Sequence, residues 1–382
     1  MLRMIFLSLA LISQISYAQN NIETSLGVDG YVRHTNREIA PNVQDEGFSH
    51  LIRLRADLTN QDKVSVKTRT IVSGQKWQGD FHSGYTTGKS NDDALSRGSE
   101  GVQLDYAFLE LPVEGWLFRG GRQEAAWGNC FTNCDDRRDR LFLLAPWKTM
   151  TTIFIYDKRN AFNNEGDMYA VAFLKRKDTW NAGLLIAGWT DKSDSYILKS
   201  VVNIAPTFGI KTEDWYFDTV WNYLGQGDES ISMYPENHLS FYLQAGHRLG
   251  SSMIEAQSVT VIDGGLISEG FETFSSVVNS SPSHNKSAIR VKTIGGIFSL
   301  SGAKKNEDSE LNMIRIGYNF SDKLNAKLAG GHFSQYDGKN DSVLDAKLSY
   351  QVNSAVTFDA KFGRLMGDTN LSATSVGLNF KY

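Results

Sequence analysis

The final stretch of the chain, residues 372–382, alternates between apolar and polar side chains and ends on an aromatic residue. Its apolar residues are Val376, Leu378, Phe380 and Tyr382. A period of two residues places these four on one face of an extended strand and the polar residues on the other face. Such a strand needs an apolar medium on one side and a polar medium on the other. This requirement constrains the fold more than any other feature of the sequence.

The same alternation recurs near the start of the chain, where charged residues occupy every second position. Arg53 and Arg55 alternate with aliphatic side chains in residues 51–58, and Lys67 and Arg69 do so in residues 64–72. Charged side chains at this spacing cannot face a dry core. They can face a water-filled lumen. The sequence therefore favours strands with an apolar outer face and a wet inner face.

The connections between the predicted strands alternate in length. Short turns are expected at 60–63, 112–115, 176–179, 250–252, 321–323 and 352–354, with longer polar segments between them. Only 41% of the residues are hydrophobic, and no segment approaches the length of apolar chain that a membrane-spanning helix needs. This pattern predicts an all-β fold, a transmembrane antiparallel β-barrel of about 16–18 strands with a long third external loop.

The N-terminus carries the features of a secretory signal peptide. Arg3 precedes an apolar run over residues 4–12, and Ser16-Tyr17-Ala18 fits a cleavage site with small flanking residues. The apolar run is too short to span a bilayer. We expect residues 1–18 to be removed and residues 19–382 to form the barrel in the outer membrane of a Gram-negative bacterium.

One connection is much longer than its neighbours. About forty residues, 126–167, separate the predicted strand that ends near Ala125 from the one that begins near Met168. This segment holds a dense charge cluster followed by the apolar run 141–147. The charged residues are Asp135, Asp136, Arg137, Arg138, Asp139 and Arg140. We predict a loop that packs against the barrel wall. The alternative is that residues 151–158 form a wall strand.

The long segment resembles the third loop of porins, which folds back into the barrel and narrows the pore. That resemblance implies a constriction formed by the charge cluster. It is also compatible with a homotrimer, which porins commonly form. The run Gly121-Arg122-Gln123, with Trp127-Gly128 after it, resembles the strand-to-loop join of substrate-channelling outer-membrane families, including the alginate exporters.

The C-terminal residues also resemble a known signal. The order Gly377-x-x-Phe380-x-Tyr382 is similar to the C-terminal motif by which barrel proteins are recognised for insertion. This resemblance implies that the barrel-assembly machinery is a partner and that outer-membrane lipid surrounds the chain.

Cys130 and Cys134 are the only cysteines. In an oxidising compartment an even pair favours a disulfide, and three intervening residues allow a small closed ring. Free thiols or a metal ligand pair are the alternatives, and no histidine lies nearby in the sequence to support a metal site.

The polar faces of the predicted strands carry about twice as many cations as acids, although the formal net charge of the chain is −4. The predicted pore-lining cations are Arg53, Arg55, Lys67, Arg69, Arg290, Lys292, Arg315, Lys327, Lys347 and Lys361. Basic rings raise the local concentration of anions in a pore. The alternative is that these charges only hydrate the wall and pair with the acids.

The sequence contains no nucleophile, phosphate-loop or metal motif, and its seven histidines are scattered. We therefore expect no enzyme activity, no cofactor and no nucleic-acid partner. The predicted function is a porin that lets small polar solutes diffuse, with a preference for anions. Two alternatives stay open: a selective channel for an acidic sugar or similar anion, and a structural or surface-recognition barrel whose pore is plugged.

Overall fold

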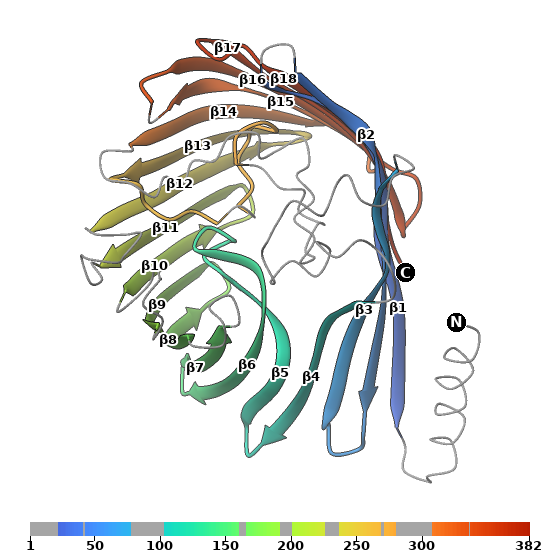
Figure 1. Ribbon diagram of the computed structural model, residues 1–382, viewed down its shortest axis with the longest axis vertical. Helices are drawn as coiled ribbons and strands as arrows, with labels where there is room; N and C mark the ends of the chain where they lie inside the picture. Colours follow the sequence, from blue (N-terminus) through green and yellow to red (C-terminus); the bar gives the residue numbers. More distant parts are fainter. Residues whose placement is uncertain are drawn as a thin grey trace.

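The computed structural model contains one closed barrel of eighteen strands, in which every strand pairs antiparallel with its neighbours and β1 pairs with β18 (Figure 1). The structure describes residues 22–40, 43–77, 103–159, 166–191, 201–225, 237–268, 271–279, 308–335 and 337–382. Within those residues no helix is long and apolar enough to cross a membrane. The predicted fold class is confirmed, at the upper end of the predicted strand number.

The strands follow the chain around the barrel in sequence order. Their bounds are β1 Glu23–Ala40, β2 Val43–Thr59, β3 Ser65–Trp77, β4 Gln103–Val113, β5 Trp116–Trp127, β6 Asn133–Trp147, β7 Met150–Arg159, β8 Gly166–Arg176, β9 Trp180–Asp191, β10 Val202–Lys211, β11 Trp215–Gly225, β12 His238–Leu249, β13 Ser252–Ile262, β14 Ser309–Asn319, β15 Leu324–Ser334, β16 Asn340–Gln351, β17 Val356–Gly367 and β18 Ser372–Lys381. The predicted signal peptide, residues 1–18, lies outside the described residues.

The C-terminal strand closes the barrel, as its alternation requires. Phe380 pairs with Gly30 of β1, and a Cβ atom at Gly30 would lie 2.8 Å from the Phe380 ring. The backbone of Tyr382 donates to the carbonyl of Val28 at 2.8 Å. Val376 is 45% exposed on the outer face. The absence of a side chain at Gly30 therefore leaves the space that the closing aromatic residue fills.

The outer face of the wall is apolar and carries aromatic residues beside the short turns. Trp116, Trp147, Trp215, Phe320 and Tyr382 are all exposed, and each lies next to a short turn or the C-terminus. Amphipathic aromatic rings are favoured at the boundary between lipid and water. These residues mark the rim of the barrel that carries the short turns.

The predicted loop over residues 126–167 is wrong in its bounds. Residues 133–147 form β6 and residues 150–159 form β7, and a two-residue turn joins these strands. The apolar run that we expected to pack as a loop is strand, because its side chains alternate between the two faces of the wall. Leu141 is 49% exposed outside the barrel, whereas Arg140 beside it is 3% exposed and faces inward. The alternative prediction of a wall strand over residues 151–158 is correct.

The upper part of the β5–β6 hairpin leaves the wall. The β4–β5 ladder ends at the pair Ala107 and Arg122, and the β6–β7 ladder begins at Arg140 and Asp157. The β5–β6 ladder continues to Trp127 and Asn133. Residues 123–139, which we call the inner hairpin, therefore form ladders only with each other and bend into the barrel (Figure 1).

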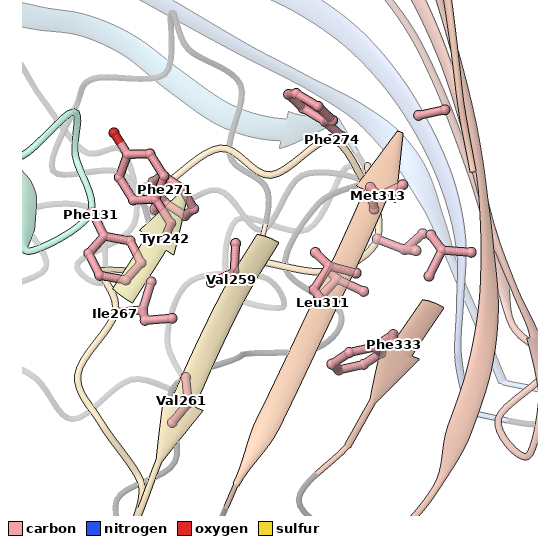
Figure 2. Packing of buried hydrophobic residues seen from close by; sticks show 14 of the residues in the cluster. Phe131, Tyr242, Val259, Val261, Ile267, Phe271, Phe274, Leu311, Met313 and Phe333 are labelled. Carbon is pink, nitrogen blue, oxygen red and sulfur yellow. The ribbon is translucent and has the colours of Figure 1, made fainter. Parts of the chain in front are cut away.

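A second segment also lies inside the barrel. Residues 263–268 and 271–279 follow β13, and we call them the inner loop. Because β13 pairs directly with β14, the connection between them is not part of the wall. Arg290 and Lys292, two of the predicted pore-lining cations, fall outside the described residues. The inner loop packs with Phe131 of the inner hairpin and with inward side chains of β11 to β18 in one apolar cluster (Figure 2).

Small side chains make room for the inner hairpin on the facing wall. Ala172, Ala187 and Ala205 of β8, β9 and β10 are buried on the inner face. The indole nitrogen of Trp127 donates to the carbonyl of Ala205 at 3.0 Å. A Cβ atom at Gly183 would lie 3.2 Å from the Trp127 ring. The hairpin is therefore seated against β8 to β10 by one aromatic residue lying over small ones.

Candidate functional site

Three lysines form a row on the inner face of the barrel. Lys327 of β15 pairs with Lys347 of β16, and Lys347 pairs with Lys361 of β17. Residues opposite each other on neighbouring strands lie about 5 Å apart, so the three ammonium groups share one narrow band. They face inward because the alternation of these strands sends their leucines outward, such as Leu328, which is 63% exposed. We call Lys327, Lys347 and Lys361 the lysine row.

The lysine row lines a cavity between the wall and the inner loop. The cavity is lined by Glu272, Thr273, Phe274, Ser276, Arg315, Lys327, Ala329, Asp345, Lys347 and Lys361. Four of these are predicted pore-lining cations, and the structure brings them together. The inner-loop residues were not predicted as site residues. The one signal for them was the run Thr-Phe-Ser-Ser-Val-Val at 273–278, which is unusually apolar for an external loop.

The acids around this cavity are mostly engaged by other groups. Glu255 accepts two hydrogen bonds from Arg315, at 2.6 and 2.9 Å. Asp345 accepts a hydrogen bond from the backbone of Ser276 at 2.5 Å. Glu272 lies 3.9 Å from Lys361. In the described part of the chain, no carboxylate lies within 4.0 Å of Lys327 or Lys347.

A second basic group lies on β2, β3 and β5, and its charges are paired. We call Arg53, Arg55, Lys67, Arg69 and Arg119 the arginine stripe. Its ion pairs are Arg53 with Asp29, Arg55 with Asp57 at 3.7 Å, Lys67 with Glu110 at 3.0 Å, Arg69 with Asp105 at 2.5 Å and with Glu124 at 3.0 Å, and Arg119 with Glu110 at 2.6 Å. The cations predicted from the sequence to line the pore here are therefore largely neutralised by neighbouring acids.

The charge cluster of the inner hairpin is only partly described. Of the six residues, the side chains of Asp135, Asp136 and Arg137 lie outside the description. Arg138 is half-buried and Asp139 is exposed. Arg140 is buried at the base of the hairpin and donates to both oxygens of Asp157, at 2.5 Å for one of them. Arg140 is therefore part of a wall ion pair, and its place at the narrowest part of the pore stays a prediction.

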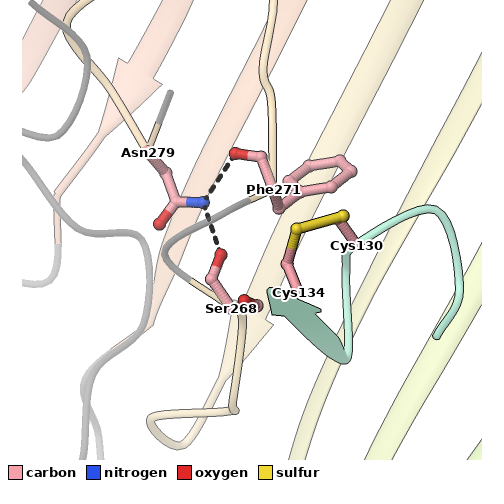
Figure 3. Close-up of a disulfide and its surroundings, with 5 residues drawn as sticks. All are labelled: Cys130, Cys134, Ser268, Phe271 and Asn279. Atoms are coloured by element: carbon pink, nitrogen blue, oxygen red, sulfur yellow. Dashed lines mark hydrogen bonds between the residues drawn. A yellow bond between two sulfur atoms is a disulfide. The ribbon is translucent and has the colours of Figure 1, made fainter. Parts of the chain in front are cut away.

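The tip of the inner hairpin carries a disulfide between Cys130 and Cys134 (Figure 3). Gly128, Asn129 and Cys130 all adopt positive φ, which turns the chain sharply before the ring. Among the described residues, no group of three or more His, Cys, Asp or Glu side chains is arranged to hold a metal ion.

Comparison with known proteins finds similar solved structures. No family model and no curated protein sequence matches this chain. Among solved structures, the outer membrane protein OpdK from Pseudomonas aeruginosa is similar, with 12% identity and a TM-score of 0.61 over 94% of this chain and 98% of that one. OpdO from the same organism has 12% identity and a TM-score of 0.63 over 94% and 97%.

OccAB3 from Acinetobacter baumannii has 9% identity to this chain and a TM-score of 0.63 over 94% of this chain and 99% of that one. Identities this low show a shared fold, and the coverage shows that the likeness extends over nearly the whole length of both chains. It agrees with the strand order and closure described above. The chain therefore has the porin-like fold of these outer-membrane proteins, a closed barrel of eighteen antiparallel strands.

Proposed function

We propose that this protein is an outer-membrane channel through which small polar solutes diffuse, with a preference for anions. The observation that carries the proposal is the lysine row. Lys327, Lys347 and Lys361 are held in register on three adjacent strands, and Lys327 and Lys347 have no carboxylate partner among the described residues. Like charges directly opposite each other destabilise a sheet. A channel for anions gives a physical reason to keep this arrangement.

The lysine row supports anion preference through its local field. Charges that line a pore with low-dielectric walls concentrate counter-ions, and selectivity follows the sign of the lining charge. The net charge of the whole chain, −4, does not enter this argument, because screening restricts each charge to its surroundings. The arginine stripe contributes little, because each of its cations has an acid partner.

Selectivity for one class of anion is a second candidate. The inner loop places Thr273 and Ser276 beside the lysine row in the same cavity. The Thr273 hydroxyl already donates to the carbonyl of Val278, and the Ser276 side chain is hydrogen-bonded to Asp345. The ammonium groups of the lysine row are therefore the groups that suit a solute with a carboxylate, such as an acidic sugar. Saturation of the anion current as this solute is added would support the selective channel, and a linear rise would support simple diffusion.

A plugged barrel is the third candidate, because the inner hairpin and the inner loop both occupy the interior. We infer that these two segments narrow the pore and leave it open. Purified protein in a planar bilayer separates the two readings. Discrete current steps support the channel, and their absence with correctly folded protein supports a plugged barrel.

Export and assembly complete the proposal. We propose cleavage after Ala18 and recognition of Gly377, Phe380 and Tyr382 by the assembly machinery; the second fits the position of β18 as the closing strand. Deletion of residues 380–382 is expected to lower the amount of assembled protein and to leave the conductance of assembled molecules unchanged.

The reversal potential across a potassium chloride gradient tests the anion preference. We expect the native channel to favour chloride over potassium. The variant with Lys327, Lys347 and Lys361 changed to Gln should lose that preference. A matched control changes Lys63, Lys148 and Lys323 to Gln, three lysines on short turns, and removes the same net charge. A native channel selective for potassium, or equal effects in both triple variants, would contradict the proposal.

A further inference from the structure

The inner hairpin and the inner loop meet at one residue, Phe131. Its carbonyl accepts a hydrogen bond from the backbone of Ser268 at 2.8 Å. Its ring meets Phe271 edge-on at 5.0 Å between centroids and Tyr242 of β12 at 5.1 Å. The rings of Tyr242 and Phe271 lie 4.9 Å apart, so the three rings contact one another (Figure 2). Phe131 is completely buried, although it lies at the tip of an external connection.

The disulfide holds Phe131 in this position. The disulfide between Cys130 and Cys134 (Figure 3) closes a small ring that contains Phe131. The backbone nitrogen of Phe131 donates to the carbonyl of Gly128 at 2.9 Å. A cross-link around a short loop restricts the conformations of the residues inside it. Both cysteines are half-buried, so part of each residue remains accessible to a reductant in the medium.

The inner loop connects Phe131 to the wall beside the lysine row. The side-chain amide of Asn279 donates to the carbonyls of Ser268 and Phe271, at 3.2 and 3.3 Å, and this closes the loop on itself. At its other side the loop is bound to the wall beside the lysines, through Ser276 to Asp345 at 2.5 Å. The same compact segment therefore contacts the hairpin at one end and covers the cation site at the other.

We propose that Phe131, fixed by the Cys130–Cys134 disulfide, is a positioning residue that keeps the inner loop over the lysine row and so sets the width of the anion path. The inference rests on the proposed function for its consequence and on the contacts of Phe131 for its mechanism. Loss of the Phe131 ring removes two aromatic contacts and leaves the wall ladders intact. The inner loop then opens more often, and the pore is wider on average.

Limited proteolysis tests the contact without any assumption about transport. Chymotrypsin cleaves after aromatic residues, and Phe271 and Phe274 of the inner loop are 1% and 5% exposed. In the Phe131→Ala variant we expect cleavage after these two residues to become about tenfold faster or more, because burial of a phenylalanine ring is lost. Mass spectrometry of the fragments identifies the sites, and heat-modifiable migration on a gel shows that the barrel is intact.

The matched control is Phe241→Ala. Phe241 lies next to Tyr242 on β12, faces outward and stacks on Trp221 at 4.7 Å. This substitution also removes a phenylalanine ring, but from the outer face of β12, away from the inner loop, so cleavage after Phe271 and Phe274 should stay at the native rate. Equal protection of the inner loop in the native protein and in Phe131→Ala would overturn the inference.

Reduction provides a test in the native chain and needs no aromatic variant. A phosphine reductant should speed cleavage after Phe271 and raise single-channel conductance. The Cys130→Ser, Cys134→Ser double variant should show both changes from the outset and no response to the reductant. If Phe131→Ala fails to assemble, Phe131→Leu and this reduction experiment decide. No effect of reduction on either readout would contradict the role of the disulfide.

The two proposals fail in different ways. If the inner loop opens in Phe131→Ala but the native channel shows no anion preference, the positioning role stands and the proposed function is wrong. If the native channel prefers anions and the loop remains protected in Phe131→Ala, the proposed function stands and the positioning role is wrong. An increase in conductance of Phe131→Ala with unchanged loop protection would also contradict the proposed mechanism.

Discussion

The lysine row and the arginine stripe are both basic groups on the inner wall, and they differ in how their charge is balanced. In the stripe, Arg69 lies 2.5 Å from Asp105 and 3.0 Å from Glu124. In the row, Lys347 has lysines on both neighbouring strands. The same alternation of residues places both groups inside. The number of inward cations therefore does not predict the field in a pore, because pairing across strands decides which charges act on a solute.

Breaking an ion pair in the arginine stripe should have the largest effect, a loss of stability of the barrel. Asp105 is 1% exposed and lies beside Arg69, with Arg53 4.0 Å away. In Asp105→Asn, the buried Arg53 and the half-buried Arg69 lose a shared carboxylate, while Arg53 keeps Asp29 and Arg69 keeps Glu124. This should destabilise the barrel by about 3 kcal/mol. The midpoint of heat-modifiable migration should fall.

The control for that variant is Lys347→Gln, which removes one of three like charges. Its expected effect on stability is within about 1 kcal/mol, and a small gain is expected because cross-strand repulsion is relieved. A large loss of stability in Lys347→Gln, with none in Asp105→Asn, would reverse the comparison between the two groups.

A smaller effect, on ion selectivity, is expected when the acid that pairs with Arg315 is neutralised. Glu255→Gln keeps a hydrogen-bond acceptor for Arg315 and removes the negative charge. The cavity beside the lysine row then gains one net positive charge. The permeability ratio of chloride to potassium should rise by about twofold, because the lining charge sets selectivity. The measurement is the reversal potential in a salt gradient, and a fall in the ratio would show that Arg315 does not act on the permeating ion.

The sequence predicted the strands of the barrel wall better than it predicted the segments inside the barrel. The alternation at residues 372–382 predicted a closing strand because a strand with two unlike faces leaves a mark in the sequence. The departure of residues 123–139 from the wall leaves no such mark, because the hairpin keeps its own ladder on both sides of the point where it bends. The disulfide of Cys130 and Cys134 was the favoured prediction, because an even pair of cysteines in an oxidising compartment favours one, with free thiols and a metal site as the alternatives.

The sequence predicted the cations of the candidate site but did not predict which of them are paired with acids. Lys327, Lys347 and Lys361 were correctly expected to lie on one face of their strands, but their alignment depends on the register of three strands, which no single segment encodes. The pairing of Arg140 with Asp157 could not be foreseen for the same reason. The inner loop was missed because its contacts, such as Ser276 to Asp345, join residues far apart in the sequence.

The smallest expected effect is the change of anion preference with ionic strength. The screening length falls from about 30 Å at 0.01 M salt to about 3 Å at 1 M. The anion preference of the native channel should therefore weaken steadily as the salt concentration rises at a constant gradient ratio. Loss of the lysine row should remove most of this salt dependence. A preference that does not change with salt would point to selection by size and not by charge.

The most direct test compares two single substitutions that each remove one inward positive charge, Lys347→Gln in the row and Lys67→Gln in the stripe. When Lys67 is changed, Glu110 keeps Arg119 as a partner at 2.6 Å, so both variants should assemble. The reversal potential across a potassium chloride gradient is measured for both. We expect a clear loss of anion preference in Lys347→Gln and a much smaller change in Lys67→Gln. Equal losses, or a larger loss in Lys67→Gln, would contradict the claim that unpaired lysines set the selectivity of this barrel.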